Sequence, residues 1–431
     1  MDSHCDKLVY GKLKANSQKL FGHDLIYLKG FLPRLLVWNH RVEVEPLVSS
    51  LEKVIDLYPY IAGRIHGINS PDPTLHGSNK GLRFVCEERD EPLPFLCDNQ
   101  PIDIHKYKGL KQLILEVESD SFDEDTPLFQ VKLSLFTNGS ILATSICHGL
   151  ADGAARFNLM SAWSAIARGL TPSPPVLDRN MLRDDVLAEA IDSSPSYWYS
   201  SANIWSQEPK FICTSDVLRL EAGFISELVN DVHISTSKMG FISRQDVIQA
   251  YVWKLLSKLG DKKDRAKSTI YFAYDYRKEI GLSRDYFGNA CDLVVLSNND
   301  IGNYSISRIA QLIRGSIKSI SKENVYADLR FLNTDTFRKN PIKARKKGLR
   351  KSFSNTFLVL NDTKFDYYNI DFGSGRPFWS CRVFPLPEKL HMPMLTIVES
   401  PLLDGAVDCH FVLPEPLFCK LRENWMTKAQ N

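Results

Sequence analysis

Two side chains with catalytic potential, His148 and Asp152, follow an apolar run in the stretch SILATSICHGLADG (140–153). An imidazole titrates near neutral pH, so it can take a proton from an attacking hydroxyl or amine and return it to a leaving group. The H-x-x-x-D spacing by itself is weak, because about one chance match is expected in a chain that contains ten histidines. On this evidence His148 is as easily the last residue of a strand as a catalytic base.

The elements expected around His148 place it at a strand end. Residues 129–136 alternate apolar and polar, as a half-buried strand does, and Asn138–Gly139 predicts a hairpin turn into a second strand. Every second residue from 142 to 148 lies on one face of that second strand. Residues 159–167 then carry the apolar spacing of a helix. His148 therefore precedes a loop and a helix, which is where α/β proteins commonly place their chemistry.

A second region with its own helices and strands follows a proline-rich break. Residues 169–180 contain three prolines, which exclude a continuous helix or a central strand. Ser243 and Asp246 form a capping-box-like start for a helix that reaches Leu259. Apolar stretches predict strands at 270–274, 291–296, 356–360, 394–398 and 407–413. We therefore expect two α/β domains of similar size, namely residues 1–180 and 213–431, joined by a connector at 181–212.

Composition and charge exclude several classes of function. The 431-residue chain is 44% hydrophobic and 24% charged, which fits a globular protein with a sizeable core. A formal net charge of +2 gives no basis for binding nucleic acid or an anionic membrane. No apolar run is long enough to span a membrane, and the N-terminus lacks the pattern of a signal peptide, so we expect a cytoplasmic protein. The nine cysteines are scattered and include no C-x-x-C pair, which predicts reduced thiols and no zinc site.

Two catalytic classes are excluded by missing motifs. The D-F-G at 371–373 also occurs in protein kinases, but the chain lacks their G-x-G-x-x-G, V-A-I-K and H-R-D motifs. Gly373, Gly375 and Pro377 favour a rigid turn at that position. The G-x-S-x-G nucleophile elbow of serine hydrolases is also missing. Cys147 precedes His148 but points to the opposite face of the strand, so we do not expect a cysteine nucleophile.

Five short motifs together resemble those of the BAHD acyltransferases, which transfer acyl groups from coenzyme A to alcohols or amines. The motif H-x-x-x-D-G is matched by His148, Asp152 and Gly153, Y-F-G-N by residues 286–289, Y-P-x-x-A-G-R by 58–64, D-R by Asp178–Arg179, and D-F-G-W-G by 371–375. Their order and separation agree along nearly the whole chain, so the combination is far more specific than any single motif. Ser374 replaces the tryptophan of the last motif, which marks a divergent member and affects the packing of that loop more than catalysis.

The resemblance implies a fold of two α/β domains similar to chloramphenicol acetyltransferase, with a solvent channel between them. His148 would lie in the channel and act as the general base, with no covalent enzyme intermediate. Asp152 would be structural, pointing away from the substrate and pairing with Arg277. Asn361, with Thr363 behind it, is the candidate donor to the oxyanion of the tetrahedral intermediate. A surface turn is the alternative for Asn361.

The candidate residues for the coenzyme A site come from several motifs and from one helix cap. They are Ser243, Arg277, Asn289, Asp371, Gly373 and Gly375. A hydroxyl at a helix N-terminus suits a phosphate, so Ser243 is either a phosphate receptor or a plain cap. The run 338–351 holds eight Lys or Arg residues. Such a run is most often a solvated face, with contact to the nucleotide phosphates as the alternative.

The sequence thus predicts a monomeric enzyme of secondary metabolism that uses acyl-CoA as co-substrate to acylate a hydroxyl or amine of a small molecule. No metal and no permanently bound cofactor are expected. One alternative is a condensation-domain-like transferase that takes the acyl group from a carrier-protein thioester. Those domains carry H-H-x-x-x-D-G, and here Cys147 stands in the place of the first histidine. The other alternative is a non-catalytic relative that binds a small molecule. The acceptor, the acyl chain and the choice between O- and N-acylation are left open.

Overall fold

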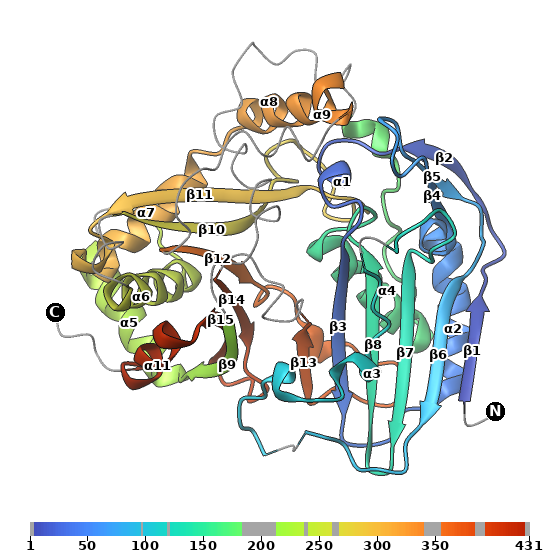
Figure 1. Ribbon diagram of the computed structural model, residues 1–431, viewed down its shortest axis with the longest axis horizontal. Coiled ribbons are helices and arrows are strands. Elements are labelled where there is room, and N and C mark those ends of the chain that lie inside the picture. Colours follow the sequence, from blue (N-terminus) through green and yellow to red (C-terminus); the bar gives the residue numbers. More distant parts are fainter. Residues whose placement is uncertain are drawn as a thin grey trace.

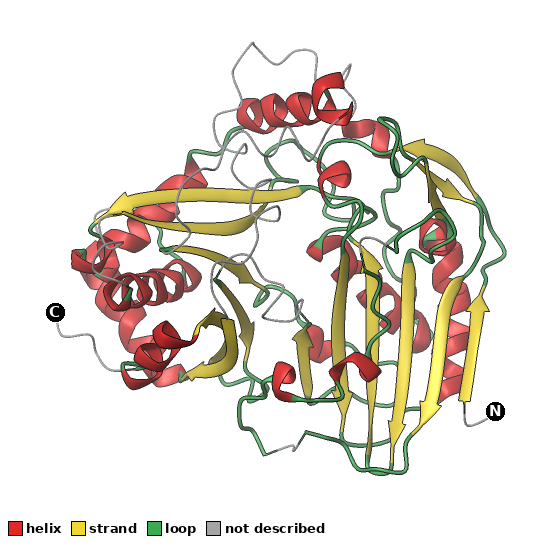
Figure 2. Ribbon diagram, viewed as in Figure 1, coloured by secondary structure: helices red, strands yellow, loops and turns green. Residues whose placement is uncertain are grey.

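Two mixed α/β units stand side by side in the computed structural model (Figure 1). The structure describes residues 4–95, 98–118, 121–182, 213–236, 240–260, 267–339, 355–383 and 393–426. Figure 2 shows that each unit contains one large sheet with helices packed against it. The predicted fold class, two α/β domains, is confirmed. The predicted connector lies largely outside the described residues, as does most of the basic run 338–351.

The first sheet is six-stranded within the described residues. Its strands, in spatial order, are β1 (His4–Val9), β6 (Leu82–Glu88), β7 (Phe129–Phe136), β8 (Gly139–Cys147), β3 (Phe31–Trp38) and β13 (Trp379–Arg382). All neighbours are antiparallel except β6 and β7. The predicted hairpin is present, but Gly139 is already paired with Phe136. The turn is therefore Thr137–Asn138, one residue earlier than expected.

Strand β7 corrects a second expectation, because it is buried along its whole length rather than on one face. Apolar residues of α2 (Val44–Leu57) and α4 (Gly153–Ala167) cover one face of the sheet. A smaller cluster that includes Trp379 covers the other face. The polar residue Lys132 is accommodated by an ion pair with Glu87, with 3.0 Å between Nζ and Oε2. Lys132 is therefore buried together with a charged partner and is not exposed to solvent.

The second sheet is also six-stranded within the described residues. Its strands, in spatial order, are β11 (Cys291–Asn299), β10 (Lys267–Asp275), β12 (Thr356–Asn361), β14 (Met394–Glu399), β15 (Val407–Pro414) and β9 (Cys213–Leu220). The five strands expected after the proline-rich break all lie here. The helices that pack against it are α5 (Ala222–Thr236), α6 (Arg244–Leu259), α7 (Ile306–Lys318) and α11 (Glu415–Glu423).

The remaining elements are a small sheet, further helices and short 3-10 turns. A small sheet contains β2 (Ala15–Lys19), β5 (Thr74–Gly77) and β4 (Arg64–His66). The helices are α1 (His23–Ile26), α3 (Leu110–Leu113), α8 (Lys322–Asn333) and α9 (Asp335–Lys339), with 3-10 turns at Pro59–Ala62, Ile104–Lys106, Arg179–Leu182, Ile301–Asn303 and Tyr367–Asn369. In the described part of the chain, no helix is both long and apolar enough to cross a membrane.

Strand β13 ties the two units together. It belongs by sequence to the unit expected at 213–431, yet it pairs with β3 at the edge of the first sheet (Figure 1). Buried residues of the segment just before it, Tyr367, Ile370 and Phe372, belong to the core of the first unit. One segment of the second expected domain therefore lies in the first unit, and residues close to β13 come to lie near the end of β8, where His148 stands.

Candidate active site

His148 follows the last residue of β8 and is held on both sides. Its backbone N–H donates to the carbonyl of Gly30 at 2.7 Å, which extends the pairing of β8 with β3. The ring of Tyr27 stacks on the imidazole, with 4.0 Å between centroids and 11° between planes. The His148 side chain is partly exposed. The neighbouring Cys147 is fully buried, and its Sγ donates to the Leu28 carbonyl at 3.4 Å. Burial raises the pKa of this thiol to about 12, so it is a packed residue and a poor nucleophile.

The side chain of Asn289 determines which nitrogen of His148 carries the proton. Its amide nitrogen donates to the carboxylate of Asp24 at 2.8 Å and to the His148 carbonyl at 2.7 Å. Because both of those partners can only accept, the amide oxygen must face the other way, toward His148 Nδ1 at 3.1 Å. Nδ1 therefore carries the hydrogen, and the lone pair is on Nε2. That arrangement is the one a general base needs.

The electrostatic surroundings keep His148 neutral. Burial is the main cause that lowers its pKa, to about 4, and the positive charges of Arg382 and Arg156 lower it further. The carboxylate of Asp152 acts in the opposite direction. A neutral imidazole at physiological pH can accept a proton without first losing one.

Asp152 makes an ion pair with Arg277 and does not contact the His148 ring. The two distances from Asp152 oxygens to Arg277 nitrogens are 2.9 and 3.1 Å, so the predicted pair is present. Asp152 is also the N-cap of α4, accepting from the Ala155 N–H at 2.8 Å, and it accepts from the Ala290 N–H at 2.9 Å. Arg277 lowers the pKa of Asp152 and outweighs the effect of burial. The carboxylate thus joins the loop after β8 to the segment before β11.

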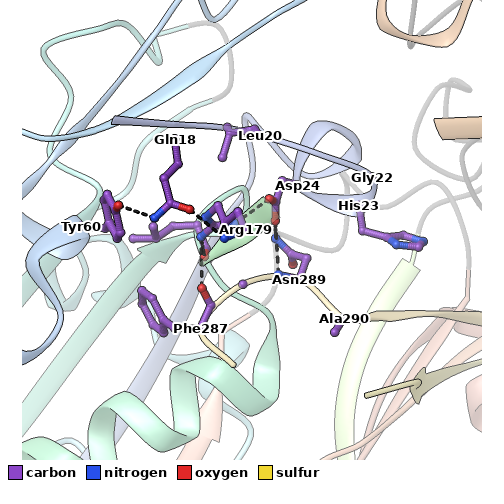
Figure 3. Close-up of polar contacts among 12 residues, drawn as sticks. Gln18, Leu20, Gly22, His23, Asp24, Tyr60, Arg179, Phe287, Asn289 and Ala290 are labelled. Atoms are coloured by element: carbon purple, nitrogen blue, oxygen red, sulfur yellow. Dashed lines mark hydrogen bonds and ion pairs between the residues drawn. The ribbon is translucent and has the colours of Figure 1, made fainter. Parts of the chain in front are cut away.

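A second buried ion pair supports the same loop, and the sequence did not reveal it (Figure 3). Arg179 donates to Asp24 at 2.5 Å and to the carbonyl of Leu150 at 2.6 Å. The other carboxylate oxygen of Asp24 accepts from the amide of Asn289, as described above. Gln18 accepts from the Arg179 N–H at 2.7 Å and donates to Tyr60. Asp24 was visible as the single acid in the run LFGHDLIYL, but nothing in the sequence indicated its partner.

The other candidate residues have their polar groups engaged by neighbouring protein groups. Ser243 is the N-cap of α6 in a capping box with Asp246, and it accepts from Arg314 at 2.8 Å. Asn361 donates to Gln245 at 2.9 Å, while its oxygen accepts from the N–H of Thr363 at 3.0 Å. Among the predicted site residues, the structure therefore brings together His148, Asp152, Arg277 and Asn289.

The D-F-G loop is a closed turn packed on the first unit. Asp371 accepts from the N–H groups of Gly373 and Gly375 at 2.7 and 2.9 Å. Both glycines have φ of +95°, a conformation that favours glycine strongly, so the turn requires them. Phe372 packs on Trp163, with 4.6 Å between ring centroids. At the position of the family's tryptophan, Ser374 Oγ accepts from the Glu43 N–H at 3.3 Å.

A cluster of arginines near His148 was not predicted. It comprises Arg34 on β3, Arg156 in the first turns of α4 and Arg382 at the end of β13, with Asp362 and Tyr367 between them; we call it the arginine cluster. Each arginine was visible in the sequence as a charge inside an apolar element, but their meeting depends on the position of β13. Among the described residues, no group of three or more His, Cys, Asp or Glu side chains could hold a metal ion.

These features define a two-unit α/β protein with a base-competent histidine where the units meet. The model of the Transferase family matches residues 31–426 of this chain. The chain therefore belongs to this family, the BAHD acyltransferases, as the motifs predicted.

Known relatives match this chain in sequence or in structure over most of its length. Hydroxycinnamoyltransferase of Narcissus pseudonarcissus is 24% identical over 79% of this chain and 78% of its own length. Baccatin III:3-amino-3-phenylpropanoyltransferase of Taxus cuspidata is 24% identical over 78% and 72%, respectively. Among solved structures, vinorine synthase has a TM-score of 0.70 at 18% identity, covering 96% of this chain and 95% of that one. F. graminearum TRI101 complexed with coenzyme A and deoxynivalenol has a TM-score of 0.72 at 15% identity, covering 95% and 98%. The structural likeness shows a shared fold.

Proposed function

We propose that this chain transfers an acyl group from an acyl-CoA thioester to a hydroxyl or amine of a small molecule, with His148 as the general base. The observation that carries the proposal is the hydrogen bond of Asn289 to Nδ1, which leaves the Nε2 lone pair of His148 free to take a proton. Membership of an acyltransferase family and the coenzyme A complex of TRI101 support acyl-CoA as the donor.

In the proposed reaction, the acceptor oxygen or nitrogen attacks the thioester carbonyl carbon while its proton moves to His148 Nε2. A new C–O or C–N bond forms, and the tetrahedral intermediate then expels the sulfur as the C–S bond breaks. His148 returns the proton to the departing thiolate, so the base is regenerated and free coenzyme A leaves. No enzyme nucleophile takes part, which agrees with the burial of Cys147.

Asp152 and Arg277 have a positioning role in this proposal. Their ion pair keeps the loop after β8 against the segment that carries Asn289, so the imidazole and its hydrogen-bond partner stay in register. The assignments of Ser243, Asn361, Asp371, Gly373 and Gly375 to donor or oxyanion binding stay predictions, as do the solvent channel, the monomeric state and the cytoplasmic location.

The test is release of free thiol from several acyl-CoA donors with pooled alcohols and amines. We expect thiol release that depends on an acceptor, and a loss of about 10²- to 10⁴-fold in His148→Ala, the usual size of a general-base contribution. His66→Ala is a matched control, because His66 is a surface histidine paired with Glu124. Equal thiol release by wild type and His148→Ala with a verified acceptor would contradict the mechanism. Release only from a carrier-protein thioester would instead favour the condensation-domain alternative.

A further inference from the structure

We propose that His23, held between Asp292 and Tyr276, is a positioning residue for the catalytic base. It acts on His148 through Asn289 and through the helix α1. The inference deepens the proposed acyl transfer and rests on it for its catalytic meaning. The position of the hydrogen on His148 can be measured without turnover, so a failure of the positioning role can be told from a failure of the proposed function.

Both ring nitrogens of His23 form buried hydrogen bonds to the second unit. Nε2 contacts the carboxylate of Asp292 on β11, and Nδ1 lies 2.8 Å from the hydroxyl of Tyr276, the residue after β10. Each of these three residues is at most 2% exposed. Because a carboxylate only accepts hydrogen bonds, Nε2 of His23 carries a hydrogen. A rotation of the ring would break a buried hydrogen bond, so His23 fixes α1 against the second unit.

The helix α1 also carries two contacts to the candidate active site. Asp24 follows His23 in the chain, but it points toward Asn289 and accepts from its amide at 2.8 Å (Figure 3). Tyr27, the residue after α1, stacks on the imidazole of His148. A helix of four residues has little stability of its own, so its position depends on its contacts. The hydrogen bonds of His23 therefore help to place the groups that hold His148.

The hydroxyl of Tyr276 gives a second route to the same site. It lies 3.4 Å from the backbone carbonyl oxygen of Asn289, within hydrogen-bond distance. The side chain of Asn289 in turn donates to the His148 carbonyl and accepts from Nδ1 of the same residue. A displacement of Asn289 would weaken the hydrogen bond that keeps the lone pair of His148 on Nε2. The contacts thus run from Asp292 to His148 across the junction of the two units.

Two buried aspartates beside this chain of contacts differ in charge, which provides a matched comparison. Asp292 uses both oxygens, one for His23 and one for the N–H of Leu293 at 2.6 Å. An asparagine has one accepting oxygen, so Asp292→Asn leaves one of the two donors facing an NH2 group. Asp328 on α8 is 3% exposed, and burial together with the charge of Asp292 raises its pKa to about 9. Its carboxyl is therefore uncharged at neutral pH, and Asp328→Asn preserves both shape and charge.

The first test is the position of the hydrogen on His148, measured by NMR of the full chain with isotope-labelled histidine. Nitrogen chemical shifts distinguish a protonated from an unprotonated ring nitrogen, and the His148 signals are identified by their loss in His148→Ala. We expect the wild type to carry the hydrogen on Nδ1. Asp292→Asn and Tyr276→Phe should show a mixture of both tautomers, whereas Asp328→Asn should keep the wild-type signals.

The second test is the kinetics of thiol release. Tyr276→Phe keeps the ring and removes the hydroxyl, so it should lower kcat by about 10- to 100-fold, the cost of a misplaced catalytic group, and leave KM nearly unchanged. Tyr326→Phe is the control, because Tyr326 is a partly exposed residue of α8 whose ring faces Lys322. If Asp292→Asn does not fold, Tyr276→Phe carries both tests.

The outcomes separate the positioning role from the proposed function. Altered His148 signals in Asp292→Asn or Tyr276→Phe, with no thiol release by the wild type, would support the positioning role and contradict the acyl transfer. Unchanged His148 signals in both variants would overturn the positioning role, whatever the thiol release. Equal effects of Asp292→Asn and Asp328→Asn would also overturn it, because both aspartates would then act through packing alone.

Discussion

Arg277 on one side and the arginine cluster on the other form two groups near His148, and they differ in the partners that compensate their charge. Arg277 has Asp152 as a bidentate partner and Asp275 as a second carboxylate. In the arginine cluster, Arg34 and Arg382 pair with the carboxylate of Asp362, whereas Arg156 donates to the Tyr367 hydroxyl and the Leu32 carbonyl. Arg277 therefore contacts two carboxylates, whereas Arg156 is held by neutral oxygen atoms, so the two sites differ in how positive charge is compensated.

His148 lies near both groups, and charges from both act on its pKa. Asp152 raises its pKa, while Arg382 and Arg156 lower it, and burial adds to the lowering. The comparison can be tested by removing the balancing charge from each group in turn, and then by changing the histidine that both of them influence.

The largest effect is expected from Asp152→Ala. The variant leaves Arg277 without its bidentate partner, and it also removes the N-cap of α4 and the acceptor for the Ala290 N–H. Breaking a buried ion pair in this way costs about 3–5 kcal/mol of the free energy of unfolding. Urea unfolding at neutral pH measures the loss. A change below about 1 kcal/mol would be typical of an exposed ion pair and would contradict the structural role.

Asn289→Ala should mainly affect turnover. It removes the group that keeps the hydrogen on His148 Nδ1, so a smaller fraction of imidazole has its lone pair on Nε2. We expect kcat to fall by about 100-fold, the usual cost of a misplaced catalytic group, with a much smaller change in KM. Asn158→Ala is the control, because its amide donates to the Arg284 carbonyl at the surface. A change confined to KM would assign Asn289 to donor binding, as first predicted.

Asp362→Asn should distinguish the two arginine groups most directly. The variant destabilises the protein because Arg34 and Arg382 lose the carboxylate that both of them contact, and added acetate can offset part of that loss by taking its place. Acetate should restore part of the lost Tm in Asp362→Asn and little in Asp152→Asn, whose site is closed around one arginine. Equal recovery of the two variants would show that charge balance does not separate the groups.

The smallest effect concerns the pH profile of the proposed reaction. Because the pKa of His148 is lowered to about 4, the base stays unprotonated as the pH falls below 6.5, and activity is lost only as the pH falls toward 4. Arg156→Met removes a positive charge, so the pKa should rise and the acid limb of kcat/KM should move upward by up to about one pH unit. A shift to lower pH would contradict this sign.

Stability should follow the same titrations. The fold disfavours protonated His148, so the free energy of unfolding decreases as the pH falls from about 6.5 toward 4. Asp362 has its pKa lowered to about 2 by Arg382 and Arg34, against the effect of burial, so its stabilising contribution is present above its ordinary pKa and is lost as the pH falls toward 2. Urea unfolding at several pH values would measure both losses.

The fold was largely predictable because its elements have clear local patterns. The apolar stripe of α6 and its capping box gave that helix its start and its buried face, and the apolar runs that predicted strands all pair in the sheets. The two errors in the first sheet came from contacts that no local pattern shows. Lys132 was predicted to be exposed because its partner Glu87 lies on another strand. The hairpin turn lies one residue earlier than predicted because Gly139 already pairs with Phe136.

The candidate site was predictable where a residue belonged to a motif. His148, Asp152, Arg277 and Asn289 are all in motifs, and the structure brings them together, although it places Asn289 on the histidine. Asp24 and Tyr27 were missed because a single acid and a single aromatic in an apolar run carry no signal of what they contact. They reach His148 and Asn289 through α1, a helix of four residues.

The sequence by itself determined the family, the two-unit α/β fold and the identity of the histidine, because spacing and order along the chain are sufficient for motifs and for secondary structure. The tertiary structure decided the proton position on His148 and the existence of the arginine cluster. Both depend on side chains more than 100 residues apart, such as Asn289 with His148 and Arg382 with Arg34 and Arg156, which meet through Asp362 and Tyr367. Charge balance in such a site depends on all the side chains that meet there, so no single stretch of sequence determines it.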